Sequence, residues 1–340
     1  MIVCKFGGTA LTPKNVSKIK RIISLDINRE IVVVSAIGKC FASDTKVTDF
    51  LIKLHNSLPD VEAFSSIGDK YRELAQICGY KDINNLLTTT LEQIVKNNYY
   101  AFTVSRGEYL SSKIVSHYLN YKFIDASTVI KFSGKGIDNI QTKKHLQKNC
   151  SGNCVIGGFY GSDHLGKIKL FSRGGSDITG AIISEKLNAT LYENWTDVNG
   201  FLLASPMKVL NPFTVPCINY SEIENLTRAG AEVLNYRSIK PVERKSIPIN
   251  IRNIYNYANS GTIISNFSPQ NSIFGIVATN ESGCFVTKIV FSLPINVILQ
   301  SLALALSSNS NNVISIDYSL NCITLRTTKD LTEVIYRSLT

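Results

Sequence analysis

Short apolar runs alternate along the first two thirds of the chain with segments in which apolar residues recur every three or four positions. The runs predict strands, and their near-continuous hydrophobicity is typical of strands buried on both faces of a parallel sheet. They lie at 1–6, 30–36, 101–105, 122–125, 129–132, 154–160, 191–195 and 247–251. The periodic segments between them predict helices. This alternation indicates an α/β fold: an open, mainly parallel sheet sandwiched by helices, with its ligand site at the carboxyl ends of the strands.

The helical segments carry start signals of their own. A helix is expected to begin near Thr12 and Pro13, and Ser221 and Glu224 have the spacing of a capping box for a helix that extends to 234. Further helices are predicted by the patterns at 46–49, 60–100, 110–118 and 178–187, the last of them amphipathic.

The pattern changes after a linker at 266–271. Strands are predicted at 273–278 and 284–291, a helix at 294–308, a hairpin at 313–318 and 322–326, and a closing helix at 331–339. An α+β module of about 70 residues is small for independent stability, so we expect it to dimerise or to dock on another domain. The sequence therefore predicts two domains, 1–265 and 272–340.

Composition narrows the class of protein. Hydrophobic residues make up 44% of the 340 positions, and no apolar run is long enough to span a membrane. The first residues enter a strand directly and leave no room for a secretion signal, so a cytoplasmic location is expected. A net charge of +10 suits anionic small substrates. Nucleic-acid binding rests on that charge alone, because no nucleic-acid motif accompanies it.

Cysteines and histidines do not predict a metal site. The eight cysteines are scattered, and the closest pair, Cys150 and Cys154, lacks a second pair or a nearby histidine. Reduced, mostly buried thiols are expected.

Two glycine turns are candidates for anion binding. The first strand ends in Lys5-Phe6-Gly7-Gly8-Thr9. A strand, a glycine turn and a helix in this order can bind phosphates. This turn is not a Walker A loop, because its lysine precedes the glycines. Arg173-Gly174-Gly175-Ser176-Asp177 opens a helix whose first N–H groups attract anions, and Arg173 adds a planar fork for a carboxylate or phosphate. An ordinary capped helix is the alternative for the second turn. Glu108 is a candidate for binding an ammonium group, or else a first-turn charge of a helix.

Taken in order, these motifs resemble those of the aspartate kinases, which have an amino-acid-kinase fold followed by an ACT regulatory region. The resemblance covers 1–265. It is carried by Lys5-Phe6-Gly7-Gly8-Thr9, Val33-Val34-Ser35-Ala36, Val47-Thr48-Asp49, Gly107-Glu108 with Ser111-Ser112, Gly158-Phe159-Tyr160-Gly161, Arg173 to Asp177, Thr196 to Val198, Ala229-Gly230-Ala231 with Leu234, and Ser260-Gly261-Thr262.

The resemblance implies a role for each matching residue. Lys5 and Asp177 are expected to be catalytic, with Lys5 neutralising charge on the transferred phosphoryl group. The nucleotide is expected at Lys5, Gly7, Gly8, Thr9, Ser35, Thr196 and Asp197. The amino-acid substrate is expected at Thr48, Glu108, Phe159, Arg173, Gly174, Gly175 and Ser176, with Arg173 on a carboxylate and Glu108 on the α-ammonium group.

The implied reaction is transfer of the ATP γ-phosphoryl group to the β-carboxylate of L-aspartate, the first step toward lysine, threonine, methionine and diaminopimelate. ATP and Mg²⁺ are the implied cofactors, and no protein metal site is expected. A kinase of the same fold for another acidic amino acid, such as glutamate, and a catalytically weak regulatory homologue are the alternatives. The expected partners are aspartate, ATP and a second copy of the chain bound through the C-terminal module, with no nucleic acid and no membrane.

Several positions depart from the aspartate-kinase pattern. They are Ala10, Leu202, Met207, Glu232 and Asn235, and Lys208 is a candidate replacement for a nucleotide-binding arginine. The ACT region is also shortened: it has the elements of about one module without that module's final strand. We therefore expect dimerisation to be retained and feedback inhibition by lysine or threonine to be reduced or absent.

Overall fold

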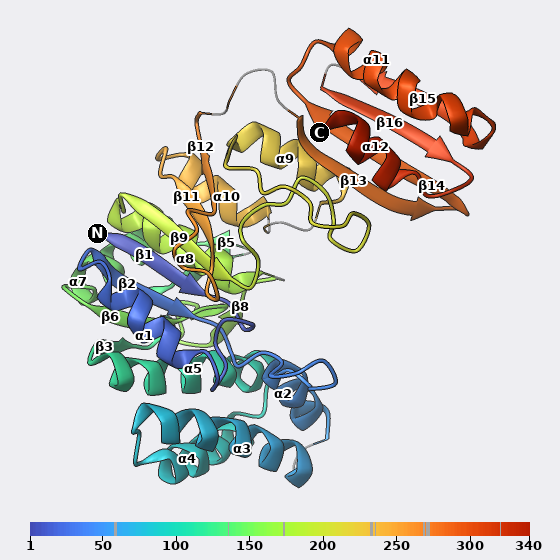
Figure 1. Ribbon diagram of the computed structural model, residues 1–340. Coiled ribbons are helices and arrows are strands. Elements are labelled where there is room, and N and C mark those ends of the chain that lie inside the picture. Colours follow the sequence, from blue (N-terminus) through green and yellow to red (C-terminus); the bar gives the residue numbers. More distant parts are fainter. Residues whose placement is uncertain are drawn as a thin grey trace. The chain divides into compact units, whose positions relative to one another are not determined.

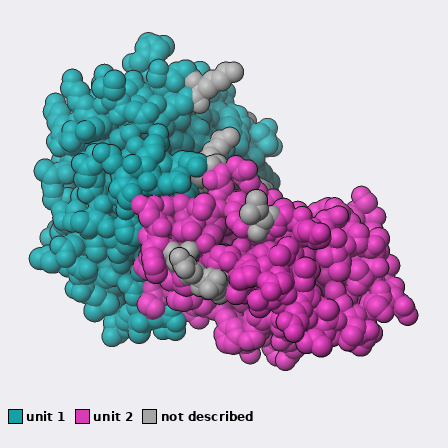
Figure 2. Space-filling model, turned by 90° about the horizontal axis from the view of Figure 1, so that it is seen from above, with its two compact units in different colours: residues 1–198, 237–259 teal, residues 199–236, 260–340 magenta. Residues whose placement is uncertain are grey.

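The computed structural model describes residues 1–57, 60–134, 136–172, 174–231, 234, 236–267, 269, 273–319 and 321–340. These residues form two compact units (Figure 2, teal and magenta). Unit 1 comprises Met1–Val198 and Arg237–Asn259, and unit 2 comprises Asn199–Tyr236 and Ser260–Thr340. The domain limits at 265 and 272 remain a prediction. No helix among the described residues has both the length and the hydrophobicity needed to cross a bilayer.

Unit 1 is built on a parallel sheet, as the sequence predicts. Its six strands lie in the order β11-β9-β1-β2-β6-β3, and each neighbouring pair is parallel (Figure 1). Their bounds are β1 Ile2–Phe6, β2 Arg29–Val34, β3 Lys122–Ile124, β6 Cys154–Gly157, β9 Leu191–Thr196 and β11 Ile249–Asn253. Every residue of β1 is buried. The carboxyl ends of the neighbouring strands therefore meet at one edge of the sheet.

Helices cover both faces of this sheet. Helix α1 (Val16–Ser24) and helix α5 (Tyr100–Leu119) share a buried apolar cluster with Cys4 and Phe6 of β1. Helix α8 (Gly175–Leu187) contacts β1, β2 and β9 on the opposite face of the sheet. The side chain of Lys5 emerges on this face and contacts Asp177 of α8.

The remaining elements of unit 1 surround this core. A second apolar cluster joins helices α2 (Val47–Asn56), α3 (Val61–Cys78) and α4 (Ile83–Asn97) to α5. The others are α6 Ala126–Val129, α7 Asn139–Asn149 and the short hairpins β4 Phe132–Ser133 with β5 Gly136–Ile137 and β7 Tyr160–Ser162 with β8 Ile168–Leu170. Helix α10 (Tyr236–Glu243) crosses the boundary between the two units in the sequence.

Unit 2 contains the predicted α+β module. Its four antiparallel strands lie in the order β13-β14-β16-β15. Their bounds are β13 Ile273–Glu281, β14 Cys284–Phe291, β15 Val313–Ser319 and β16 Cys322–Thr327, and the helices are α11 Ile295–Leu306, the 3-10 turn η1 Ser307–Asn312 and α12 Thr332–Leu339. The sequence predicts a module without its final strand. Among the described residues no strand follows α12, and the sheet edge beside β14 is occupied by β13, which precedes β14 in the sequence. Unit 2 also holds the parallel strands β10 Cys217–Asn219 and β12 Thr262–Ser265, and helix α9 Tyr220–Ala229.

Three sequence predictions of secondary structure are wrong. Residues 101–105 are not a strand but the first turns of α5, so Glu108 lies inside a helix. Val129 ends α6, and of the strand predicted at 129–132 only Phe132 belongs to a strand, the two-residue β4. The helix predicted at 221–234 begins one residue earlier, after a capping box of Asn219 and Glu222, and ends at Ala229 because Gly230 adopts a left-handed C-cap.

Helix α8 also differs from its predicted amphipathic pattern. It is buried almost all round, and even Glu185 and Lys186 are mostly covered and paired with each other at 3.0 Å. Small residues allow this close packing: a Cβ at Gly180 would lie 2.6 Å from the ring of Tyr192 in β9. This close packing fixes the position of the first turn of α8, which carries Ser176 and Asp177.

Candidate active site

The candidate residues of unit 1 gather at the carboxyl ends of β9, β1, β2 and β6, four strands that are neighbours in the sheet. Lys5 lies near the end of β1, Ser35 follows β2, Phe159 follows β6, and Thr196 ends β9. Backbone hydrogen bonds join the strand ends: the Ser35 N–H donates to Phe6 O at 3.1 Å. The predicted edge of the sheet is thus where these residues meet.

The loop after β1 is held by close backbone contacts. The Gly7 N–H donates to Trp195 O at 3.2 Å, and the Gly38 N–H donates to Gly8 O at 3.0 Å. A Cβ at Gly38 would lie 2.4 Å from Gly8 O, and a Cβ at Gly7 would lie 3.0 Å from Lys5 Nζ. Only glycine fits these approaches without displacement. Thr9 is exposed at the tip of the loop.

Lys5 forms the polar centre of the site. Its Nζ lies 2.7 Å from Asp177 Oδ1, and both side chains are largely buried. Lys5 Nζ also donates to Asn194 Oδ1 at 3.3 Å, and Asn194 Nδ2 donates to Asp177 Oδ1 at 3.1 Å. Sequence reasoning missed Asn194. A polar residue in an otherwise buried strand was the available signal, but nothing in the sequence indicated which group it would face.

The first turn of α8 presents backbone N–H groups to the same edge. Gly174 is the N-cap in a left-handed conformation with φ 73°, and a Cβ at Gly175 would meet the ring of Phe159 at 2.6 Å. Phe159 itself has φ 74°, a conformation that costs a side-chain-bearing residue about 1–2 kcal/mol. A Cβ at Gly158 would lie 2.6 Å from Ser176 Oγ. The loop that follows β6 and the N-terminus of α8 are therefore in close contact. Arg173 lies outside the described residues.

Glu108 places a carboxyl group inside the protein. Its side chain is 4% exposed, and its Oε2 has no hydrogen-bond partner among the described residues. Burial raises the pKa of Glu108 to about 8, even though a backbone hydrogen bond from Ala36 favours the ionised form. A cationic ligand group would supply the missing partner. The carbonyl oxygen of Glu108 lies 3.0 Å from where a Cβ of Gly157 would be, so α5 touches the end of β6.

Helix α2 and the loop after β2 pack against α5 at Gly107, the residue before Glu108. A Cβ at Gly107 would lie 2.7 Å from Ala36 Cβ and 3.4 Å from Val47 Cγ1. Thr48, the next residue, is half-buried in the first turn of α2. The structure thus brings the neighbourhoods of Ser35, Thr48 and Glu108 together.

The end of β9 is more open. Thr196 is half-buried, and its Oγ1 donates to the exposed Asp197 at 3.0 Å, while Thr196 O accepts from the Ile254 N–H at 2.9 Å.

The positions that depart from the aspartate-kinase pattern lie in both units. Ala10 is buried in unit 1, and Met207 is 89% exposed in unit 2. Lys208 pairs with Asp330 at 2.6 Å within unit 2. Leu202 forms a β-bridge with Thr214. Glu232 and Asn235 lie outside the described residues.

This edge of the sheet combines three chemical features. The glycine loop and the α8 N-terminus offer N–H groups to anions, Lys5 supplies a fixed positive charge, and Glu108 offers a buried acceptor to a cation. A ligand pair made of a polyphosphate and a zwitterion with an ammonium group matches this arrangement.

The sequence of this chain is similar to those of known amino acid kinases. Residues 1–253 match the model of the amino acid kinase family. Aspartokinase 3 of Bacillus subtilis (strain 168) is 33% identical over an alignment of 313 positions that covers 84% of this chain and 68% of that protein. The chain spans 39% and 32% of the bifunctional aspartokinase/homoserine dehydrogenases of Buchnera aphidicola and Daucus carota, which it also matches.

Solved structures agree over the whole chain. The crystal structure of Clostridium acetobutylicum aspartate kinase is similar with a TM-score of 0.88 at 29% identity, and the match covers 100% of both chains. Escherichia coli aspartokinase III in complex with aspartate and ADP shares the fold, with a TM-score of 0.74 at 22% identity over 98% of this chain and 80% of that one.

Proposed function

The chain belongs to the amino acid kinase family, and we propose that it acts there as an aspartate kinase. In the proposed reaction the β-carboxylate of L-aspartate attacks the γ-phosphorus of ATP, the bond to the β,γ-bridging oxygen breaks, and 4-phospho-L-aspartate and ADP form. One observation carries the proposal: the charged Lys5–Asp177 pair and Glu108, whose Oε2 has no hydrogen-bond partner among the described residues, stand at one edge of the sheet.

We propose that catalysis relies mainly on neutralising the negative charge of the transferred phosphoryl group. A carboxylate nucleophile needs no general base, so positioning and stabilisation of the transferred phosphoryl group account for most of the rate. Lys5 would approach the γ-phosphoryl oxygens, and Asp177 would hold its Nζ in place. The backbone of Gly7 and Gly8 would follow the phosphates.

The rest of the nucleotide site is proposed from position. Thr9 lies at the tip of the loop after β1, the proposed phosphate loop, and Ser35 follows the neighbouring strand β2. Thr196 and Asp197 stand at the open end of β9. Mg²⁺ prefers phosphate oxygens, water and one or two carboxylates. The exposed carboxylate of Asp197 fits this preference and would hold the ion with the phosphates. Bound there, Mg²⁺ would neutralise charge on the nucleotide.

The amino-acid pocket is proposed on the other side of Lys5. Glu108 would receive the α-ammonium group, which satisfies its free oxygen and removes the cost of its buried charge. Arg173 would grip a carboxylate. The ring of Phe159, together with Thr48 and the N-terminus of α8 (Gly174, Gly175 and Ser176), would shape the remaining walls.

Trapping of the acyl phosphate with hydroxylamine tests the function. We expect aspartate hydroxamate when the protein is incubated with ATP, Mg²⁺ and L-aspartate. Hydroxamate from glutamate but not from aspartate would instead assign the chain to another acidic amino acid. Absence of product from both would contradict the proposal that the chain is a kinase.

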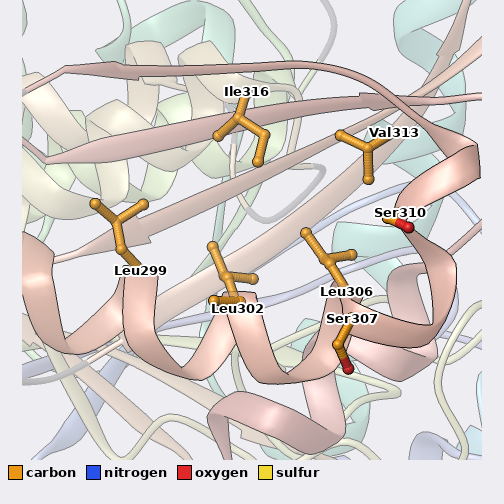
Figure 3. A pocket seen from close by; sticks show the side chains of 8 residues that line it. Leu299, Leu302, Leu306, Ser307, Ser310, Val313 and Ile316 are labelled. Carbon is orange, nitrogen blue, oxygen red and sulfur yellow. The ribbon is translucent and has the colours of Figure 1, made fainter.

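We also propose that the C-terminal module binds a second copy of the chain. Figure 3 shows an open hollow in which Leu299, Leu302 and Leu306 of α11 face Val313 and Ile316 of the edge strand β15. On β15, Ile314, Ile316 and Tyr318 are 52%, 42% and 70% exposed. An apolar edge strand of this kind is a natural surface for pairing with another strand, and a second copy offers the same surface in return.

A further inference from the structure

We propose that Asn194 is a positioning residue for phosphoryl transfer, which holds Lys5 and Asp177 in one arrangement through both ends of its amide. The inference rests on the proposed kinase function and adds a residue that neither the motifs nor the family resemblance includes.

The sheet register places Asn194 directly beside Lys5. The two residues are Cα partners in the parallel strands β1 and β9, so their side chains emerge on the same face. Their strand neighbours point the other way: Cys4 Sγ donates to Glu193 Oε2 at 3.2 Å, and Phe6 stacks on Trp195. Asn194 is 4% exposed and Lys5 is 8% exposed. The backbone that carries Asn194 is thus fixed by the sheet.

The amide is used at both ends. Asn194 Oδ1 accepts from Lys5 Nζ at 3.3 Å, and Nδ2 donates to Asp177 Oδ1 at 3.1 Å, while Lys5 Nζ lies 2.7 Å from the same carboxylate oxygen. The reversed amide would set its NH₂ group against an ammonium and its oxygen against a carboxylate. Only one orientation therefore satisfies the triangle.

This triangle addresses a difficulty of lysine as a catalytic group. The lysine side chain is flexible, and a single contact with Asp177 leaves its ammonium free to swing about that carboxylate. A second acceptor on a neighbouring strand restricts the ammonium to one side. The same amide restrains Asp177, whose helix α8 also carries the N–H groups of the site. Charge stabilisation is most effective when its donors are fixed before the reaction.

A matched pair of substitutions separates positioning from packing. Asn194→Leu keeps the number and the branching of the side-chain heavy atoms and removes both hydrogen bonds. Asn250→Leu makes the same change in the next strand, β11, where Asn250 is 8% exposed and its Oδ1 has no hydrogen-bond partner among the described residues. We expect kcat of Asn194→Leu to fall roughly 10- to 100-fold with both KM values within about threefold, and kcat of Asn250→Leu to stay within about twofold. An unchanged kcat in Asn194→Leu, or an equal loss in both variants, would overturn the inference.

A second variant keeps the test decisive if Asn194→Leu does not fold. Asn194→Asp retains an oxygen toward Lys5 and sets a second carboxylate oxygen toward Asp177. Two carboxylates that share a site raise the pKa of one of them. The groups around Asp177 are Lys5, Asn194 and Tyr192, whose hydroxyl donates to the Asp177 carbonyl at 3.1 Å.

We expect the acidic limb of the kcat profile of Asn194→Asp to move up by about one pH unit, with activity recovered at higher pH. A profile that is lowered at every pH without a shift would assign Asn194 a structural role only. Failure of the kinase proposal is distinguishable, because the wild type would then form no hydroxamate from aspartate or from glutamate.

Discussion

Glu108 links the chemistry of the site to the stability of the protein. Burial raises the pKa of its carboxyl group to about 8 in the folded chain, from an ordinary value of 4.5. Between these two values the folded state binds the proton that the unfolded state releases. The free energy of unfolding contributed by this group is therefore fully present below about pH 4.5 and is lost as pH rises toward 8.

Replacing Glu108 by glutamine removes this pH dependence. We expect Glu108→Gln to match the wild type near pH 4.5 and to be more stable by about 3–5 kcal/mol above pH 8, because the amide has no charge to bury. Denaturant unfolding at several pH values measures the difference. The exposed Glu62→Gln, which changes the same atoms on α3, is the control. A stability difference that does not vary with pH would contradict a buried, titrating Glu108.

The same residue should make aspartate binding depend on pH. An ammonium group pairs with an ionised carboxylate, so Glu108 must lose its proton when the amino acid binds. We expect KM for aspartate to fall as pH rises toward about 8, and Glu108→Gln to raise KM and to abolish this trend. A wild-type KM that stays constant over this range would show that Glu108 does not bind the ammonium group.

Single residues also mark the limit of prediction from sequence. Lys5, Glu108 and Asp177 are identified because motifs surround them, and the structure brings Lys5 and Asp177 into contact. Asn194 has no motif of its own, and its partner Lys5 lies 189 positions away. Its position becomes informative only once the register of β1 and β9 is known. The unpartnered oxygen of Glu108 likewise depends on the packing of three separate segments.

At the scale of elements, continuous apolar strands are predicted well and α5 is not. The strands of the parallel sheet are short and mostly apolar, and those of the C-terminal module combine apolar residues with polar ones along each strand. Residues 101–105 contain aromatic and β-branched side chains, which favour a strand locally. They are nevertheless the start of a 20-residue helix, because that helix buries Thr103 to Glu108 against the sheet edge and α2. Tertiary packing overrides local preference here.

Close approach of two loops is an element-scale requirement. A Cβ at Gly38 would lie 2.4 Å from Gly8 O, a backbone atom that cannot move without shifting the phosphate loop. We expect Gly38→Ala to lower kcat/KM for ATP at least about tenfold and to reduce stability by about 1–3 kcal/mol. Gly136→Ala, where a Cβ meets nothing within 4 Å, should change neither quantity. Equal behaviour of the two variants would contradict the close contact of the loops.

At the scale of the whole molecule, the C-terminal module should set the oligomeric state. We expect a mass of twice 37.6 kDa by light scattering for the wild type, and a monomer for the double variant Leu299→Glu, Ile316→Glu, because two buried charges oppose pairing. Leu165→Glu, at an exposed turn of unit 1, is the control and should remain a dimer. A monomeric wild type, or a double variant that stays dimeric, would place the contact elsewhere.

Lys5 is the residue on which the proposed phosphoryl transfer depends most directly. The most direct test compares hydroxamate formation from ATP, Mg²⁺ and L-aspartate by the wild type, by Lys5→Ala and by Lys186→Ala. Lys186 is a second buried lysine, paired with Glu185 on α8, and it controls for the loss of a buried cation. We expect Lys5→Ala to lose roughly 100- to 1000-fold in kcat and Lys186→Ala to keep most of its activity. Hydroxamate formed at the wild-type rate by Lys5→Ala would contradict a catalytic role of Lys5.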